Sequence, residues 1–120
     1  MIETLTASWE TLQTDETRSV QAALHEAGFE RADAYRYNSA SILVRVIDPQ
    51  FEGLSVEKRH DLIEPALEQL PERTQGDILM LYAFAPSELY DPQRQGPQIP
   101  SAWKQYLRNS EFEDPTQSVL

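Results

Sequence analysis

Apolar residues recur at helical spacing in residues 14–28. Thr14 is a typical N-cap, and the acidic residues Asp15 and Glu16 that follow it suit the positive end of a helix dipole. Gly28 can adopt the left-handed conformation that often ends a helix. The pattern predicts an amphipathic helix whose apolar stripe consists of Val20, Ala23, Leu24 and Ala27.

A second helical pattern runs from residue 56 to about residue 70, with Ser55 at the N-cap position. Its apolar positions are Ile63, Ala66, Leu67 and Leu70. Pro65 lies inside this pattern, where its ring would clash with the carbonyl of Asp61 at a cost of about 3 kcal/mol in a regular helix. We therefore expect a kink or a break at Pro65.

Three segments have the pattern of β-strands. Residues 34–37 and 41–47 flank the turn-forming pair Asn38-Ser39, which predicts a hairpin. Residues 41–47 alternate between two faces, of which one should be buried and the other partly wet. Residues 77–84 are almost all apolar and lie between Gly76 and Pro86, which is typical of a strand covered on both faces. We expect this last strand to lie in the interior of the sheet.

The order helix, strand, strand, helix, strand predicts a small α+β domain of αββαβ topology, with its helices on one face of a three-stranded sheet. We place this domain at residues 14–91, after an N-terminal extension of residues 1–13. Residues 92–120 form a Pro/Gln-rich linker and C-terminal tail, in which residues 101–109 could form a short helix and residues 111–120 look frayed. The expected core residues are Leu24, Val44, Val46, Ile63, Leu67, Leu79 and Leu81.

The charge of the chain narrows the classes of function. Its 120 residues carry 20 acidic and 10 basic side chains, for a formal net charge of −10 at pH 7. An acidic surface repels phosphate, which disfavours binding to nucleic acid and to anionic lipid. Because the chain has no Cys, any metal would have to be held by His, by carboxylates or by a partner. Without a basic leader or an apolar run of about 20 residues, we expect a cytoplasmic protein that does not enter a membrane.

His60 is the candidate residue for acid–base chemistry or metal binding, because Asp61 or Glu64 could orient its imidazole. The spacing lacks the second histidine of a helical zinc site, and no serine lies in a nucleophile-elbow setting. A structural or capping role is the competing interpretation of His60. We therefore expect no catalytic residues and no enzymatic activity.

Three motifs together resemble the BolA family. They are the Phe51-Glu52-Gly53 turn after the 41–47 strand, the Arg59-His60 pair that opens a helix, and the Ala85-Pro86-Ser87-Glu88 segment that ends the last strand. The resemblance covers residues 14–90. It implies an αββαβ fold related to KH domains and a non-enzymatic role with monothiol glutaredoxins, with which BolA proteins hold or pass on a [2Fe–2S] cluster.

The chain departs from the family at one candidate cluster ligand. In the family a histidine begins the third strand, and the matching position here is Asp77. A hard anionic oxygen is a poor substitute for imidazole at the iron of a cluster. The resemblance leaves His60 as the one nitrogen donor, so we expect no cofactor of the chain's own and an iron–sulfur cluster only if a partner shares it.

Two functions remain open at this point. The first is a BolA-like adaptor or regulatory domain that docks a protein partner, expected to be of glutaredoxin type, through Phe51, Gly53, Arg59 and His60. The alternative is a KH-like nucleic-acid-binding regulator. The net charge of −10 and the absence of a GxxG loop disfavour this alternative.

The charge predicts that the protein does not bind DNA or RNA tightly enough to matter at physiological salt. Fluorescence anisotropy with labelled single-stranded and double-stranded oligonucleotides at about 150 mM salt measures this. We expect no dissociation constant tighter than about 1 μM, the tight end of the usual non-specific range. A sub-micromolar value for any of these oligonucleotides would contradict the prediction.

Overall fold

The αββαβ order is present with one short helix added. The structure, a computed structural model, describes residues 9–89, Asn109 and Phe112. The elements are α1 (Asp15–Glu26), β1 (Arg31–Asn38), β2 (Ser41–Ile47), α2 (Val56–Leu67), α3 (Glu72–Asp77) and β3 (Ile78–Phe84). Short 3₁₀ helices lie at Trp9–Leu12 (η1), Pro49–Phe51 (η2) and Pro86–Glu88 (η3). None of the described helices is long and apolar enough to cross a membrane.

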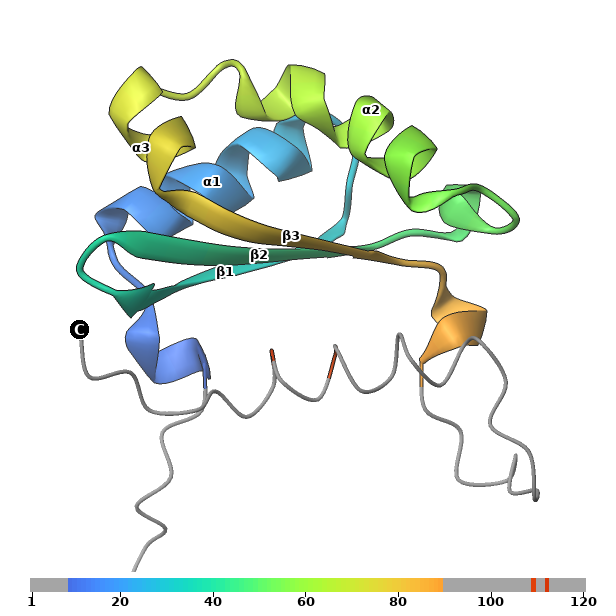
Figure 1. The fold of residues 1–120 in the computed structure, drawn as a ribbon, viewed down its shortest axis with the longest axis horizontal. Coiled ribbons are helices and arrows are strands. Elements are labelled where there is room, and N and C mark those ends of the chain that lie inside the picture. The colour runs from blue at the N-terminus through green and yellow to red at the C-terminus, as the bar shows by residue number, and fades with distance from the viewer. Residues whose placement is uncertain (1–8, 90–108, 110–111, 113–120) are drawn as a thin grey trace, which may run out of the picture.

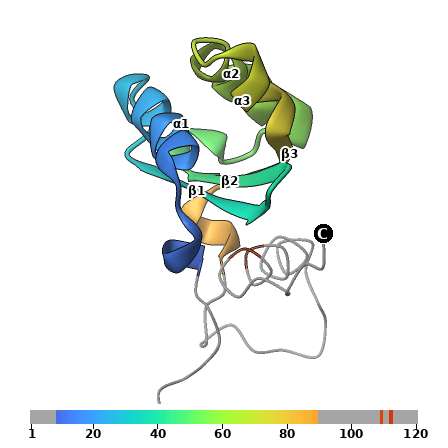
Figure 2. The same cartoon turned by 90° about the vertical axis from the view of Figure 1, so that its left-hand side faces the viewer.

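The sheet has the strand order β1-β2-β3, with β1 antiparallel and β3 parallel to β2. α1, α2 and α3 cover one face of it (Figures 1 and 2). The predicted α+β fold, with its helices on one face of a three-stranded sheet, is confirmed. A parallel pair needs a long crossover connection, and α2 with α3 supplies it between β2 and β3.

The prediction that residues 77–84 lie in the interior of the sheet is wrong. The hairpin places β1 on one edge of β2, so the crossover can add β3 only to the other edge. β2 is therefore the central strand, and it is buried from Ile42 to Ile47. In β3 only the carboxyl-terminal half is buried, whereas Leu79 is 58% and Met80 44% exposed.

Local signals fixed the ends of the first elements. The Thr14 hydroxyl accepts a hydrogen bond from the Thr17 amide at 3.3 Å, and Gly28 has a φ of 102° after the helix. Asn38 belongs to β1, and its side chain accepts a hydrogen bond from the amide of Ala40 at 2.9 Å in the hairpin turn. The turn is therefore Ser39-Ala40, one residue later than predicted.

α2 begins as predicted and ends early. The hydroxyl of Ser55 accepts a hydrogen bond from the amide of Lys58 at 3.2 Å, which confirms the N-cap. The helix continues through Pro65 and ends two residues later at Leu67, and α3 starts at Glu72. The predicted helix to about residue 70 is thus three residues too long.

The main core lies between the helices and the sheet. Of the seven residues expected there, Leu24, Val44, Val46 and Ile63 are buried in it, and Leu67 and Leu81 are partly buried against it. Leu79 was wrongly placed in the core because β3 is an edge strand. Ala27, assigned to the apolar stripe of the first helix, is exposed, and the buried residues of α1 are Thr17, Val20 and Leu24.

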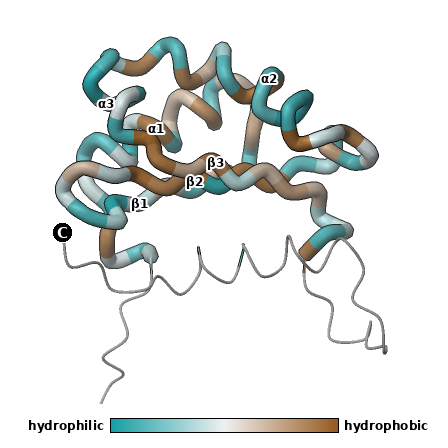
Figure 3. The backbone as a smooth tube through the Cα atoms, in the orientation of Figure 1, coloured by the Kyte–Doolittle hydropathy of each residue, from teal (hydrophilic) through white to brown (hydrophobic). Residues whose placement is uncertain are grey.

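A second apolar cluster covers the opposite face of the sheet. It consists of Trp9, Tyr35, Leu43, Ile47, Tyr82, Phe84 and Phe112. Successive side chains of a strand point to opposite faces of the sheet. Because hydrophobic residues follow each other along β2 and β3, these strands contribute side chains to both clusters (Figure 3).

The frayed end expected from residue 111 onward is wrong at Phe112, which is fully buried. The short helix expected at residues 101–109 lies outside the described residues, apart from Asn109, which is helical.

Neighbouring residues of α2 test the assignment of its buried face. Ile63 is fully buried, whereas Leu62 is 43% exposed. We expect Ile63→Ala to lower the free energy of unfolding by about 2–5 kcal/mol because it leaves a cavity in the core. The matched variant Leu62→Ala should change it by about 0.5 kcal/mol or less. Urea unfolding of the two variants measures the difference, and equal effects would contradict the packing of α2.

Candidate functional site

Arg59 is the centre of the region that carries the three motifs. It lies in the first turns of α2 and is only 3% exposed. Its Nη1 and Nη2 donate to Oε1 and Oε2 of Glu88 at 2.6 and 2.7 Å, an arrangement in which both arms of the guanidinium meet both carboxylate oxygens. The pair joins α2 to η3, which follows β3.

The remaining contacts of Arg59 tie in two further segments. Its Nε donates to the carbonyl oxygen of Leu54 at 3.0 Å, and Nη1 also donates to the carbonyl oxygen of Ala83 at 3.0 Å. The guanidinium carbon lies 5.9 Å from the centre of the Phe51 ring. One side chain therefore fixes the turn, α2, β3 and η3 relative to one another.

The contact between Arg59 and Glu88 shifts the pKa of both residues. The hydrogen bonds from Arg59 to Glu88 raise the pKa of Arg59 above its ordinary value, against the effect of burial. Burial by itself raises the pKa of Glu88, but the hydrogen bonds from Arg59 and from the amide of Ala85, together with the positive charge, outweigh it. The pKa of Glu88 is thus lowered, and the pair is charged at neutral pH.

His60 caps the next carbonyl along β3. Its Nε2 donates to the carbonyl oxygen of Leu81 at 3.0 Å, and the side chain is half-buried. Leu81 and Ala83 are two residues apart, so both carbonyls point to the same side of the strand, which is the side away from β2. The Arg59-His60 pair thus holds α2 against the outer edge of β3. A neutral imidazole that donates through Nε2 keeps its lone pair on Nδ1.

Phe51 and Gly53 shape the turn before α2. Phe51 is fully buried, with its ring centre 6.1 Å from that of Phe29. Gly53 is exposed and has a φ of 75°, a left-handed conformation that strains residues with a Cβ. The turn therefore places one aromatic anchor in the core and one bare backbone segment at the surface.

The four residues predicted to bind a partner fall into two pairs. Phe51 and Arg59 lie inside, where they hold the turn and the helix in place, and Gly53 and His60 lie where a partner can reach them. Val56 lies four residues before His60 and therefore on the same side of α2 as His60. Its side chain is 42% exposed. We call Gly53, Val56 and His60 the turn–helix surface. Sequence reasoning did not single out Val56, because an apolar residue at the start of a helix gives no signal that it is exposed.

An open depression of about 310 Å³ lies between the turn and another side of α2. Its lining residues are Leu54, Lys58, Asp61 and Leu62. The walls are largely apolar, and Leu62 is one of the few large apolar side chains exposed on the described surface. Such a hollow can receive one apolar side chain of a docked protein.

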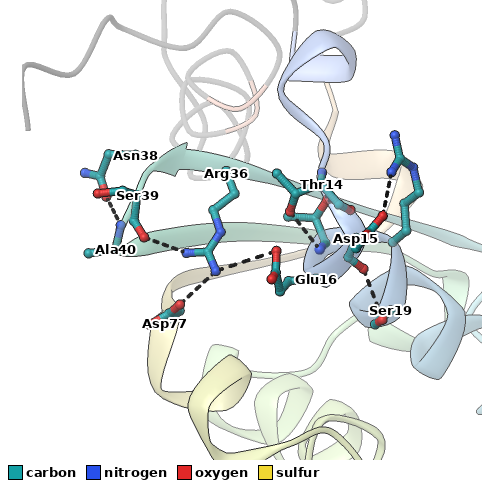
Figure 4. A network of polar contacts seen from close by, with 11 residues as sticks. Thr14, Asp15, Glu16, Ser19, Arg36, Asn38, Ser39, Ala40 and Asp77 are labelled. Carbon is teal, nitrogen blue, oxygen red and sulfur yellow. Dashed lines mark hydrogen bonds and ion pairs between the residues drawn. The ribbon is translucent and has the colours of Figure 1, made fainter.

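Asp77, at the position of the family histidine, is engaged elsewhere. Its Oδ2 lies 2.8 Å from Nη2 of Arg36 on β1, and the same nitrogen lies 4.0 Å from Oε1 of Glu16 on α1 (Figure 4). The described residues contain no group of three or more His, Asp or Glu side chains that could hold a metal ion.

Glu88 is the residue of this region whose role sequence reasoning missed. The Ala-Pro-Ser-Glu segment was recognised as a motif, but nothing local indicates that its carboxylate reaches back over 29 residues to Arg59. The available signal was the joint occurrence of the Arg59-His60 pair and this acidic residue, since a buried arginine needs a carboxylate partner.

These features define a small α+β domain with a three-stranded mixed sheet, in which an Arg-His pair joins the crossover helix to the outer edge of the last strand. A solved structure with this architecture is the solution structure of the BolA1 protein from Mus musculus, with a TM-score of 0.52 and 20% sequence identity. The match covers 84% of this chain and 85% of that chain. The BolA-like fold is thereby confirmed. No protein-family model and no curated protein sequence matches the chain.

The buried ion pair predicts a large and pH-dependent effect of Glu88→Ala. We expect a loss of about 3 kcal/mol in the free energy of unfolding at neutral pH, because the variant leaves Arg59 buried without a counter-charge. The pKa of Glu88 is lowered by folding, so its contribution is complete above the ordinary value of 4.5 and is lost as the pH falls below it. The difference between wild type and variant should therefore shrink towards about pH 3.

Chemical unfolding of both proteins at several pH values measures this difference. The control is Arg18→Ala, which removes the exposed Arg18–Asp15 pair on α1 and should cost about 0.5 kcal/mol or less. Equal losses in the two variants, or a Glu88→Ala loss that does not change with pH, would contradict the role of the pair.

Proposed function

We propose that this protein is a non-enzymatic adaptor domain of BolA type, which docks a partner protein through the turn–helix surface. The BolA1 fold and the three BolA-like motifs, which meet around Arg59, support this assignment. Arg59 and Phe51 hold the surface rigid from within. A surface fixed before binding loses little conformational freedom on docking, which favours recognition of a protein partner.

The observation that carries the proposal is the way His60 is held. The hydrogen bond from Nε2 to Leu81 fixes the imidazole ring, and no contact in the described part of the chain occupies Nδ1. The exposed side chain of Val56 lies one helical turn before it, and the bare backbone of Gly53 lies in the turn that precedes α2. The surface therefore offers one oriented nitrogen next to an exposed apolar side chain, a combination that suits a specific contact at a protein interface.

The resemblance to BolA proteins supports a monothiol glutaredoxin as the class of partner. The chain has no Cys, and Asp77 is paired with Arg36, so all thiolate ligands of a shared cluster would have to come from outside this chain. The one donor that the turn–helix surface could add is Nδ1 of His60. The proposed role is therefore docking to a cluster-carrying partner, with His60 at the point of contact.

The test mixes the protein with a monothiol glutaredoxin, with and without its cluster, and follows binding by calorimetry and the cluster by visible circular dichroism. We expect wild type to bind and His60→Ala to bind more weakly by about tenfold, because the variant removes the oriented contact. The matched control is His25→Ala, since His25 is the only other histidine and is exposed on a different helix, α1. It should behave as wild type.

The circular dichroism separates ligation from docking. A spectrum that differs from that of glutaredoxin alone with wild type, and returns to it with His60→Ala, supports a contact of Nδ1 with the cluster. An unchanged spectrum with His60-dependent binding supports docking alone. No binding to either form of glutaredoxin, or equal binding by His60→Ala and His25→Ala, would refute the proposed partner and surface.

A further inference from the structure

The outer edge of β3 has a capped half and an open half. Arg59 and His60 occupy the outward carbonyls of Ala83 and Leu81, in the carboxyl-terminal half. The sheet order leaves β3 with β2 as its one neighbour in the described part of the chain. Leu79 lies two residues before Leu81, so its backbone groups point to the same outward side, and no contact from α2 caps them. The amide of Ile78 is already bonded to the carbonyl of Gln75, so the open backbone of this stretch is that of Leu79. An uncapped strand edge is what an added strand needs.

The open half is also apolar. β3 contains no charged residue from Ile78 to Phe84, although edge strands usually carry charges or proline that block pairing with other chains. Leu79 and Met80, both in the open half, are among the four large apolar side chains exposed on the described surface. The pairing with β2 shifts register at this point, and Leu79 lies in the shift. The open half therefore combines the uncapped backbone of Leu79 with two exposed apolar side chains.

Acidic residues flank this stretch. Arg59 contacts Ala83 and His60 contacts Leu81, so α2 runs antiparallel to β3. One helical turn beyond His60, the exposed Glu64 lies on the same side of α2, over the part of β3 that precedes Leu81. Across α2, α3 and the segment between them, the exposed acidic residues are Glu57, Asp61, Glu64, Glu68 and Glu72, and the exposed basic residues are Lys58 and Arg73. The exposed charges of these helices are therefore mostly negative, and Glu64 is the one placed nearest the open half.

We propose that residues 78–80 on the outer edge of β3 accept an extended, positively charged segment of another protein as an additional strand. The backbone edge supplies the hydrogen bonds, Leu79 and Met80 supply apolar contact, and Glu64 with its acidic neighbours selects Lys or Arg in the incoming segment. This surface lies at the opposite end of α2 from Gly53 and Val56. The inference therefore does not depend on the turn–helix surface or on a glutaredoxin.

A second copy of the chain fits this edge less well. Each copy has a net charge of −10, so two copies would bring like charges together at the edge. An open stretch of three residues also provides little of the roughly 1,200–2,000 Å² that a stable protein–protein interface buries. A flexible basic segment avoids both problems, because it can wrap over the acidic helices beyond the strand.

The test is an NMR titration of the full chain with two matched nine-residue peptides. Both contain alternating Val and Thr, flanked by two Lys at each end in one peptide and by two Glu in the other. We expect the Lys peptide to bind with a dissociation constant of about 1 mM or tighter, to shift the amides of residues 78–81 and of Glu64, and to bind more weakly in added salt. The Glu peptide should cause no such shifts.

Two variants locate the site. Leu79→Lys introduces a charge on the edge at an exposed position, and it should weaken binding of the Lys peptide by about tenfold or more. Met80→Lys is a second variant with the same expectation. Val56→Lys, also at an exposed apolar residue but on the turn–helix surface, should leave peptide binding unchanged. It should weaken only glutaredoxin binding, which keeps the two proposals separable.

Several results would overturn the proposal. They are the absence of shifts at the β3 edge with the Lys peptide, equal binding of the two peptides, and unchanged binding in both Leu79→Lys and Met80→Lys. A dimer in sedimentation experiments that Leu79→Lys dissociates would show that a second copy occupies the edge, and would equally refute the basic segment as its occupant.

Discussion

A buried guanidinium is the constraint on which the rest of this structure depends. Arg59 cannot lose its charge, so burying it at 3% exposure requires a full set of acceptors. Glu88 and the carbonyls of Leu54 and Ala83 provide them, and these groups come from three separate segments. The turn, the crossover helix, the edge strand and η3 must therefore be in place together, which makes the corner of the domain rigid.

The same constraint decides what His60 can do. Once Arg59 is fixed, the next residue of α2 lies against Leu81, and Nε2 is committed to a backbone carbonyl. The ring itself is half-buried. The structural role of His60 is therefore compatible with the docking role proposed for it.

A second buried arginine lies on the opposite face of the sheet. Arg45 of β2 is buried beneath Trp9 and Phe112, with its guanidinium carbon 5.7 Å and 4.5 Å from their ring centres. It donates to Asp33 at 2.6 Å and to Asn109 at 2.8 Å. A cation between aromatic rings gains attraction where water is excluded. Residues near both ends of the chain are thereby fastened to the second face of the sheet.

The features that the sequence predicts correctly are those that arise from short-range interactions. Thr14 and Ser55 cap helices through their own hydroxyls. Residues 41–47 are rich in the β-branched residues that are typical of strands. These elements therefore follow from interactions between residues close together in the sequence. The element order and the BolA-like motifs followed from the same local patterns. Of the predicted partner-binding residues, the sequence identified the region but not which side chains point outward.

The features that the sequence does not predict depend on residues that are distant along the chain. An apolar run such as residues 77–84 is the same pattern whether the strand is central or is an edge strand covered over half its length. The hairpin and the crossover connection place this strand at the edge of the sheet. The ion pair that occupies Asp77, at the end of α3, requires Arg36 of β1, and the burial of Phe112 requires a surface built by three strands. Such contacts join residues far apart in sequence, and no local pattern encodes them, because the free energy that selects them arises only once the sheet has formed.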